Sequence, residues 1–271
     1  MKDLFKTVKM ISDNKSIIVN WPSLGDASEN FGDKLTPFLV EQISKQATYS
    51  SMEVCNFFNK PVYKVIGSSL GNSHDDNSIV WGTGFISYKS IPKYKPRKIY
   101  AVRGPLTRNK FLKHDIDCPE VFGDPALLLP RYLDVNVPKI KEVGFVPHFR
   151  EANLPILLSL KKLPFVEVIS IKSSIIDFIR AIKSCKRVVT SSLHALIVCD
   201  TFEIPSLWVS LSSNVLGDGF KFHDYYSSIG YEGISARSFK NNAEFENLIQ
   251  ETKTHKLNID LEKLLNSCPF L

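Results

Sequence analysis

Residues 188–209 read VVTSSLHALIVCDTFEIPSLWV, and this stretch decides the fold. The β-branched run at residues 188–190 is typical of a buried strand. The apolar stretch after His194 is too long for a turn, so it predicts a helix, which Pro205 ends before a second strand at residues 207–209. At the carboxyl edge of a parallel sheet, such a turn points its polar side chains into the crevice where open α/β sheets bind ligands. The helix start adds unpaired N–H groups and a positive dipole end, so the segment predicts an anionic ligand.

The role of His194 has a structural alternative. Many helices begin with a capping Ser or Thr, such as Ser191 or Ser192 here, and a histidine at that place can simply satisfy a backbone group. This segment alone leaves a functional and a capping interpretation equally open.

Strands alternate with helices along the rest of the chain. Short β-branched or aromatic runs bounded by Gly, Asn or Pro predict strands at residues 16–20, 62–66, 78–81, 98–102, 143–146 and 165–170. Apolar residues at helical spacing and helix-start signals predict helices at residues 34–44, 104–114, 152–160 and 173–184. This alternation predicts an α/β fold with mostly parallel sheets covered on both faces.

A domain boundary is expected in residues 130–141, PRYLDVNVPKIK, which contain two prolines and little periodicity. We therefore expect two doubly wound, Rossmann-like domains that face a cleft, an N-terminal one over residues 1–135 and a C-terminal one over residues 136–240. Residues 241–271 are expected to form helices that pack back on the N-terminal domain.

Bulk composition narrows the class of protein. The 271 residues are 44% hydrophobic and 23% charged, which is typical of a globular chain, and the net charge of +6 favours anionic partners. The basic residues form no dense block and no zinc-finger spacing, so we expect no nucleic-acid partner. The five cysteines are scattered without a Cys-x-x-Cys pair, which argues for reduced thiols in the cytosol and against a structural zinc site. No stretch approaches the roughly 20 apolar residues of a membrane helix, so we expect a soluble, cytoplasmic protein.

Three turns in the first half follow expected strands. Asn30-Phe31-Gly32-Asp33 precedes a helix; its glycine permits close backbone approach, and Asp33 either caps the helix or acts as a base. Trp81-Gly82-Thr83-Gly84-Phe85 forms either a tight turn against a ligand or a bulge. Arg103 and Arg108 follow the next strand, where an arginine can grip a carboxylate or phosphate with two parallel hydrogen bonds, or form a surface ion pair.

In the second half, His148 and Arg150 end a strand and are expected to face the same cleft as His194. Lys221, after the last strand, offers a further cation. Asp124 lies in a Gly-Asp-Pro turn, and we expect it to be structural.

Taken in order, these motifs resemble one known family. The residues that carry the resemblance are Asn30-Phe31-Gly32-Asp33, Trp81-Gly82-Thr83-Gly84-Phe85, Val102-Arg103-Gly104-Pro105-Leu106-Thr107-Arg108, Gly123-Asp124-Pro125-Ala126-Leu127-Leu128-Leu129-Pro130, Pro147-His148-Phe149, Ser191-Ser192-Leu193-His194-Ala195-Leu196-Ile197 and Lys221-Phe222-His223-Asp224-Tyr225-Tyr226. Each is weakly specific, but their ordered combination, from about Asn30 to Gly230, resembles the polysaccharide pyruvyl transferases. The compact length is similar to the bacterial exopolysaccharide, ketal-forming branch.

The resemblance implies a fold similar to the two-domain glycosyltransferase-B architecture, with the acceptor on the N-terminal side and the donor on the C-terminal side. It implies that phosphoenolpyruvate, as co-substrate and without a further cofactor or metal, donates a pyruvyl group to two hydroxyls of a sugar in an exopolysaccharide or capsule repeat unit. A cyclic ketal forms and phosphate is released. The family also suggests a glycan acceptor carried on a lipid, and hence peripheral contact with the inner face of the membrane.

The resemblance also assigns site residues. A histidine in the family's Arg-Leu-His signature is the favoured general acid, and it corresponds to His194, with Asp33 as the second expected catalytic residue. Ser192 stands at the position of the signature's arginine, so another cation must contact the donor, with Arg103 the first choice. The expected substrate-binding residues are Asn30, Trp81, Arg103, Arg108, His148, Arg150, Ser191, Ser192 and Lys221.

Two other functions remain open on the sequence. A nucleotide-sugar glycosyltransferase of the same architecture needs a carboxylate to hold a ribose, and Asp224 or Glu203 are the candidates. A non-catalytic carbohydrate-binding relative keeps the cleft without the acid.

Overall fold

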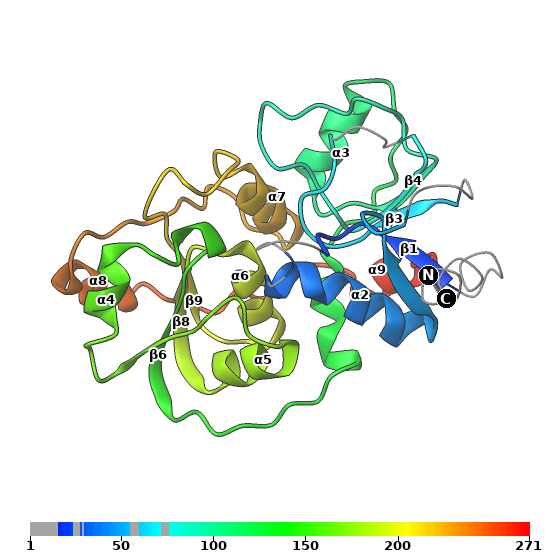
Figure 1. The fold of residues 1–271 in the computed structure, drawn as a ribbon. Coiled ribbons are helices and arrows are strands. Elements are labelled where there is room, and N and C mark those ends of the chain that lie inside the picture. Colours follow the sequence, from blue (N-terminus) through cyan, green and yellow to red (C-terminus); the bar gives the residue numbers. More distant parts are fainter. Residues whose placement is uncertain (1–15, 24–27, 29, 55–59, 72–75) are drawn as a thin grey trace.

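The described residues form two separate sheets, and every strand pair in both is parallel. The computed structural model describes residues 16–23, 28, 30–54, 60–71 and 76–271 (Figure 1). The expected α/β class with parallel sheets is confirmed. Within the described residues, no helix combines the length and the apolar character that a membrane span requires.

The first sheet has the strand order β2-β1-β3-β4-β5. Its strands are β1 (Ser16–Val19), β2 (Ala47–Ser50), β3 (Val62–Lys64), β4 (Ser78–Trp81) and β5 (Lys98–Ala101). Successive side chains of a strand point to opposite faces, and β4 shows this: Trp81 belongs to the core on the side of α2 (Phe31–Ser44), whereas Val80 belongs to the core on the side of α3 (Pro105–Leu112).

The second sheet has the strand order β7-β6-β8-β9. Its strands are β6 (Lys141–Val146), β7 (Val166–Val168), β8 (Cys185–Thr190) and β9 (Ser206–Trp208). Helices α5 (Ile175–Lys183) and α6 (Leu193–Thr201) cover one face, and α4 (Pro155–Leu160) and α8 (Asn242–Ile249) cover the other. The fully apolar run at the end of β8 follows from this double cover, since Val188 and Val189 are both buried, on opposite faces.

Some elements differ from the expectation. Helix α2 begins at Phe31, three residues before the expected start, because Asn30 in an extended conformation is its N-cap. Strand β2 was not expected; it lies at the edge of the first sheet, and its residues, Ala-Thr-Tyr-Ser, carry little apolar signal. Helix α7 (Phe220–Ser228) and the short 3-10 helix η3 (Phe149–Glu151) were also not expected. The turn Gly123-Asp124-Pro125, expected to lead from a strand into a helix, opens the short 3-10 helix η2 (Pro125–Arg131).

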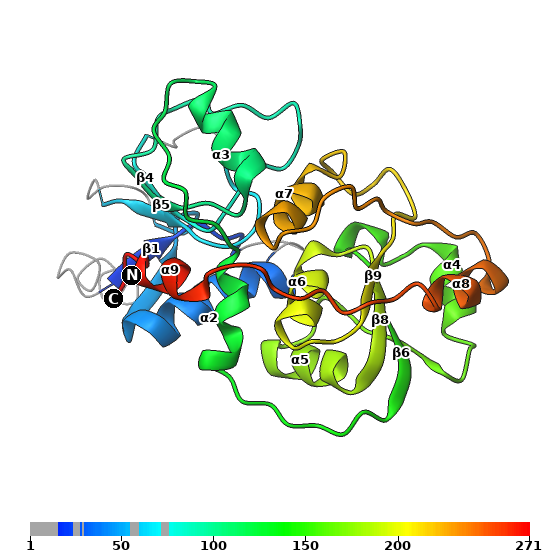
Figure 2. The same ribbon diagram turned by 180° about the vertical axis from the view of Figure 1, so that it is seen from behind.

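The C-terminal segment was expected to pack on the N-terminal half, and this is only partly correct. Helix α8 packs on the second sheet instead, through Phe245, Leu248 and Ile249. The chain then crosses to the first sheet (Figure 2), where α9 (Leu261–Asn266) packs against η2. There the Trp81 Nε1 donates to the Leu264 carbonyl at 3.1 Å.

The two sheets share one continuous core. The rings of Phe31 and Phe178, from α2 and α5, stack with their centroids 4.1 Å apart. In each sheet the strand order reverses beside the first strand, between β1 and β3 in one and between β6 and β8 in the other. Ligands of open α/β sheets bind at the carboxyl ends of the strands at such a reversal, so the topology points to two neighbouring crevices.

Candidate functional site

A pocket of about 290 Å³ lies where the two reversals meet. The first sheet contributes Asn20, which follows β1, and residues 67–69, which follow β3. The second sheet contributes residues 148–150, which follow β6, and residues 192–194, which follow β8. Lys221, in the first turn of α7, completes the wall. The structure therefore brings Asn30, Asp33, His148, Arg150, Ser192, His194 and Lys221 of the expected site together in one pocket.

His194 lies against the backbone of α2. A Cβ atom at Gly32 would overlap the imidazole ring, so only glycine fits there; on another side, a Cβ at Gly67 would lie 3.9 Å from the ring's Cε1. The His194 Nδ1 is buried and has no hydrogen-bond partner in the described part of the chain. Ser192, the N-cap of α6, makes no side-chain capping bond. The capping interpretation of this turn is therefore wrong, because neither side chain satisfies the helix start.

Lys221 is the buried cation of the pocket. Its side chain is only 9% exposed, and it makes no hydrogen bond or ion pair with any described residue. The Nζ lies 5.5 Å from the centroid of the Phe222 ring. Burial, followed by the positive charges of Arg103 and Arg150, lowers the Lys221 pKa to about 8, although the carboxylates of Glu151 and Asp33 act in the opposite direction, so the ammonium is still mostly charged at neutral pH. A buried charge that makes no ion pair is costly, and an anionic ligand in contact with it would reduce that cost.

Two imidazoles lie in the same pocket. Burial, followed by the charge of Lys221, lowers the pKa values of both His148 and His194 to about 3. Both rings are therefore neutral at neutral pH. The His148 Nδ1 accepts from the Arg150 backbone N–H at 3.2 Å, and the His148 backbone N–H donates to the Ser191 Oγ at 2.9 Å. These bonds hold the turn after β6 against the turn after β8.

Asp33 lies in the first turn of α2 and is not the cap, because that place belongs to Asn30. The Asn30 Nδ2 donates to the Asp33 Oδ2 at 2.8 Å. Burial raises the Asp33 pKa to about 6, although the Asn30 hydrogen bond and the charge of Lys221 act in the opposite direction. A carboxyl group with this pKa is suited to exchange protons near neutral pH.

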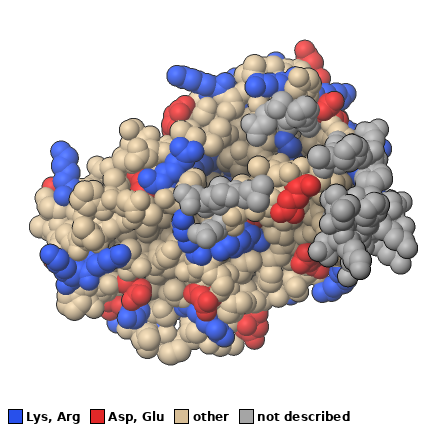
Figure 3. All heavy atoms as spheres, viewed as in Figure 1, with Lys and Arg blue, Asp and Glu red and all other residues tan. Residues whose placement is uncertain are grey.

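On the face in Figure 3, Lys and Arg side chains gather near the middle of the molecule. The pocket itself has the cations Lys221 and Arg150 and one carboxylate, Asp33. Its charge therefore favours an anion, as the sequence predicted.

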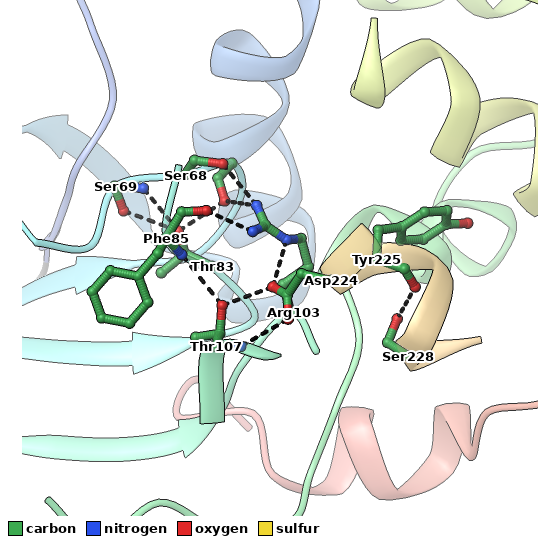
Figure 4. A network of polar contacts seen from close by, with 10 residues as sticks. Ser68, Ser69, Thr83, Phe85, Arg103, Thr107, Asp224, Tyr225 and Ser228 are labelled. Carbon is green, nitrogen blue, oxygen red and sulfur yellow. Dashed lines mark hydrogen bonds and ion pairs between the residues drawn. The ribbon is translucent and has the colours of Figure 1, made fainter. Parts of the chain in front are cut away.

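Arg103 does not line the pocket, contrary to the expectation that it contacts the donor. It is fully buried, and its guanidinium already donates to four oxygens: the Asp224 Oδ2 at 2.9 Å, the Ser68 Oγ at 2.7 Å, the Phe85 carbonyl at 2.7 Å and the Gly67 carbonyl at 3.2 Å (Figure 4). The turn at residues 67–69 lines the pocket, and Asp224 is on the same helix as Lys221. Arg103 is therefore a positioning residue that ties one wall of the pocket to the helix of the buried lysine.

Asp224 and Glu203, the carboxylates considered for a ribose, are not placed for that role. Asp224 is fully buried and accepts from the backbone N–H and the hydroxyl of Thr107 as well as from Arg103. Glu203 is exposed beyond the end of α6 and does not line the pocket.

Trp81 and Arg108 also lie away from the pocket. Trp81 is the last residue of β4 and points to the face covered by α9, where its Nε1 bonds Leu264 and Ser267. Arg108 lies on α3, and its Nε donates to the Cys118 carbonyl at 3.0 Å. Asp124 is structural, as expected, because its side chain caps η2 by accepting from the Ala126 N–H.

Sequence reasoning missed the turn at residues 67–69 and Asn20. The signal was present, since the Gly-Ser-Ser turn follows a β-branched strand in the same way as the turns that were singled out. Ser191 does not line this pocket but a neighbouring one.

Comparisons with known proteins show which proteins this chain is similar to. The model of the family "Polysaccharide pyruvyl transferase" matches residues 44–213. The chain is 29% identical to the uncharacterized protein L143 of Acanthamoeba polyphaga mimivirus over 210 residues, which are 75% of this chain and 72% of that protein. It is also 29% identical to the succinoglycan biosynthesis protein ExoV of Rhizobium meliloti (strain 1021) over 161 residues, 57% of this chain but only 48% of ExoV. A crystal structure of a Klebsiella pneumoniae protein matches with a TM-score of 0.49 at 12% identity, covering 89% of this chain and 98% of the other.

Proposed function

This chain belongs to the polysaccharide pyruvyl transferase family, whose model matches more than half of it, and we propose that it transfers a pyruvyl group from phosphoenolpyruvate to a sugar of an exopolysaccharide or capsule repeat unit. The products are a cyclic ketal and inorganic phosphate. One observation carries the proposal: Lys221, buried and without an ion pair or hydrogen bond to any described residue, lies in the same pocket as His194, whose Nδ1 has no partner among the described residues.

The charge of the donor matches the pocket. Phosphoenolpyruvate has a carboxylate and a phosphate, and we assign Lys221 and Arg150 to them. Ser192 replaces the arginine of the family signature, and its small side chain lies in the same wall as Lys221. Lys221 then supplies the cation that the signature position lacks, in place of Arg103.

The chemistry needs an acid and a base. Protonation of the donor's methylene carbon makes its neighbouring carbon electrophilic, and one sugar hydroxyl attacks that carbon and loses its proton. The second hydroxyl then displaces phosphate, and its proton leaves with the phosphate. We assign the acid to His194 and the base to Asp33.

The pKa of Asp33 supports its assignment as the base, and His194 can act as the acid once the bound donor raises its pKa. Asp33, with a pKa of about 6, is mostly ionised at neutral pH and can accept a proton. The His194 pKa of about 3 reflects burial and the charge of Lys221. An anionic donor between Lys221 and His194 offsets that charge, so the His194 pKa rises when the donor binds and the ring takes up the proton that it delivers.

The arrangement of the two sheets supports a glycosyltransferase-B-like architecture, which we propose here with lobes at residues 1–135 and 136–240. In this division α9, from the segment 241–271, packs on the first lobe and α8 on the second. We also propose a cytoplasmic location with a lipid-linked acceptor at the inner face of the membrane, which the family resemblance and the net charge of +6 support.

Donor binding tests the function without any acceptor. Isothermal titration with phosphoenolpyruvate should show binding that Lys221→Met weakens by tenfold or more, because a hydrogen bond to a charged group is worth roughly 1.5–3 kcal/mol. Lys183→Met is the matched control: Lys183 also stands over an aromatic ring, with its Nζ 4.6 Å from the centroid of Phe202, but it does not line the pocket.

A nucleotide-sugar glycosyltransferase would bind UDP-glucose in preference to phosphoenolpyruvate. Binding of UDP-glucose but not of phosphoenolpyruvate would refute the proposal in favour of a glycosyltransferase. Equal donor affinity in Lys221→Met and the wild type would remove Lys221 from the donor site. With a suitable glycan, phosphoenolpyruvate should release phosphate and UDP-glucose should not.

A further inference from the structure

A second pocket, of about 420 Å³, opens beside the first at the carboxyl end of β9. Leu216 lines both pockets, and the adjacent residues Ser191 and Ser192 line one each. A molecule in the second pocket would therefore lie next to one in the first.

The second pocket differs in chemistry from the first. Its lining includes the hydroxyls of Ser191, Ser210, Ser212 and Ser213, the carboxylate of Asp218, and the apolar side chains of Trp208 and Phe222. No Lys or Arg occurs among the described residues that line it. The charge of Lys110 reaches Asp218, but its Nζ is held by the carbonyls of Tyr88 and Ser90, at 2.7 Å and 2.6 Å. This wall has acceptors and hydroxyls but no lining cation.

The loop at residues 217–219, which forms one wall of the second pocket, has a constrained backbone. This loop has a positive φ at every position, 107° at Gly217, 51° at Asp218 and 79° at Gly219. Of the three residues, only Asp218 has a side chain beyond hydrogen. Such backbone conformations cost of order 1–3 kcal/mol for a non-glycine residue and cluster at functional sites. A Cβ at Gly217 would overlap the carbonyl of Ile86, which lines the first pocket, so this loop is packed directly against that pocket.

Ser212, which also lines the second pocket, is fixed by a hydrogen bond. The Ser212 Oγ donates to the Glu151 Oε1 at 2.7 Å, and Glu151 is fully buried. Glu151 directly follows Arg150 of the first pocket, so one turn shapes both.

We propose that the second pocket is the acceptor subsite and that it takes a neutral pyranose rather than a sugar acid. The assignment rests on the proposed function, which makes the first pocket the donor site. Asp218 and the hydroxyls of Ser210 and Ser213 match the hydroxyl groups of a sugar, and the edge of Trp208 offers an apolar contact for a ring face. A uronate carboxylate would instead face the Asp218 carboxylate with no lining cation to balance it. The acceptor then lies on the second half of the chain and not on the N-terminal side that the family resemblance suggested.

Saturation-transfer NMR tests this with a matched pair of probes, methyl β-D-glucopyranoside and methyl β-D-glucopyranosiduronate, in the absence of phosphoenolpyruvate. The wild type should bind the neutral glycoside and bind the uronate at least tenfold more weakly. Asp218→Asn should lower the affinity for the neutral glycoside about tenfold and reduce the protein's preference for the glycoside over the uronate. Asn tolerates positive φ, so this variant keeps the backbone. Asp115→Asn is the control, because Asp115 is also exposed and also has a positive φ, of 57°, but does not line the pocket.

Each contrary result overturns the proposal. These are no binding of the neutral glycoside, equal or tighter binding of the uronate, an unchanged affinity in Asp218→Asn, or displacement of the glycoside by UDP, which would mark the pocket as a nucleotide site. Because no donor is present, a failure here is separate from a failure of phosphoenolpyruvate to bind the first pocket.

Discussion

Replacement of Arg103 by alanine separates a positioning role from a donor contact. Arg103 and Asp224 are both fully buried, with 2.9 Å between the Nε and the Oδ2. Removal of one partner of a buried pair leaves an uncompensated charge and costs roughly 3–5 kcal/mol. For a chain of this size each kcal/mol lowers the melting temperature by about 2–4 °C, so Arg103→Ala should melt roughly 6–20 °C below the wild type.

The assay is thermal and urea unfolding of Arg103→Ala, Asp224→Asn and the double variant. The two single changes should be strongly non-additive, because both break the same buried pair. The affinity of each variant for phosphoenolpyruvate is also measured, by titration at a temperature where that variant is folded. An Arg103→Ala protein that melts like the wild type while losing donor affinity would refute this reasoning and restore Arg103 as a donor contact.

Two further predictions concern His194. Gly32→Ala should abolish turnover and lower the melting temperature, because the added methyl group overlaps the buried imidazole of His194, which must move to make room; retained turnover would show that the ring position is not required. The folded-state pKa of His194 is about 3, below the ordinary 6.5, so the unfolded chain binds more protons than the folded chain between these pH values. The free energy of unfolding therefore falls as the pH drops below 6.5, by at most about 1.4 kcal/mol per pH unit for this group. Asp33, raised from 3.8 to about 6, has the opposite sign and adds stability as pH falls through 6. Urea unfolding at pH 7, 6 and 5 should therefore give a shallower acid slope for His194→Asn than for the wild type, and equal slopes would contradict the shift.

The sequence predicted the parts of the site that lie at the ends of apolar strands. The turn before α6 follows a buried strand with an unmistakable β-branched pattern, and the local rule that polar turns follow parallel strands places His194 correctly. Strand β4 and the Val188-Val189 end of β8 are apolar because both of their faces are covered, so their positions were clear from the sequence.

The same rule failed for Arg103 and Trp81, because it fixes the edge of the sheet but not the direction of a side chain. Arg103 turns back into the protein towards Asp224, which lies 121 residues away in the sequence. Trp81 is on the face that α9 covers, and the sequence around β4 gives no sign of that long-range contact. Such long-range partners decide whether a polar or aromatic side chain meets solvent or the core, and they carry no local pattern.

The return of α9 to the first sheet has a consequence for folding during synthesis. Trp81 leaves the ribosome early, whereas Leu264, whose carbonyl accepts its indole N–H, emerges about 180 residues later. The first sheet therefore exposes an unfinished apolar face until α9 has been made. A fragment cut in the linker between the two sheets would keep that face open, and its expected behaviour is association rather than independent folding.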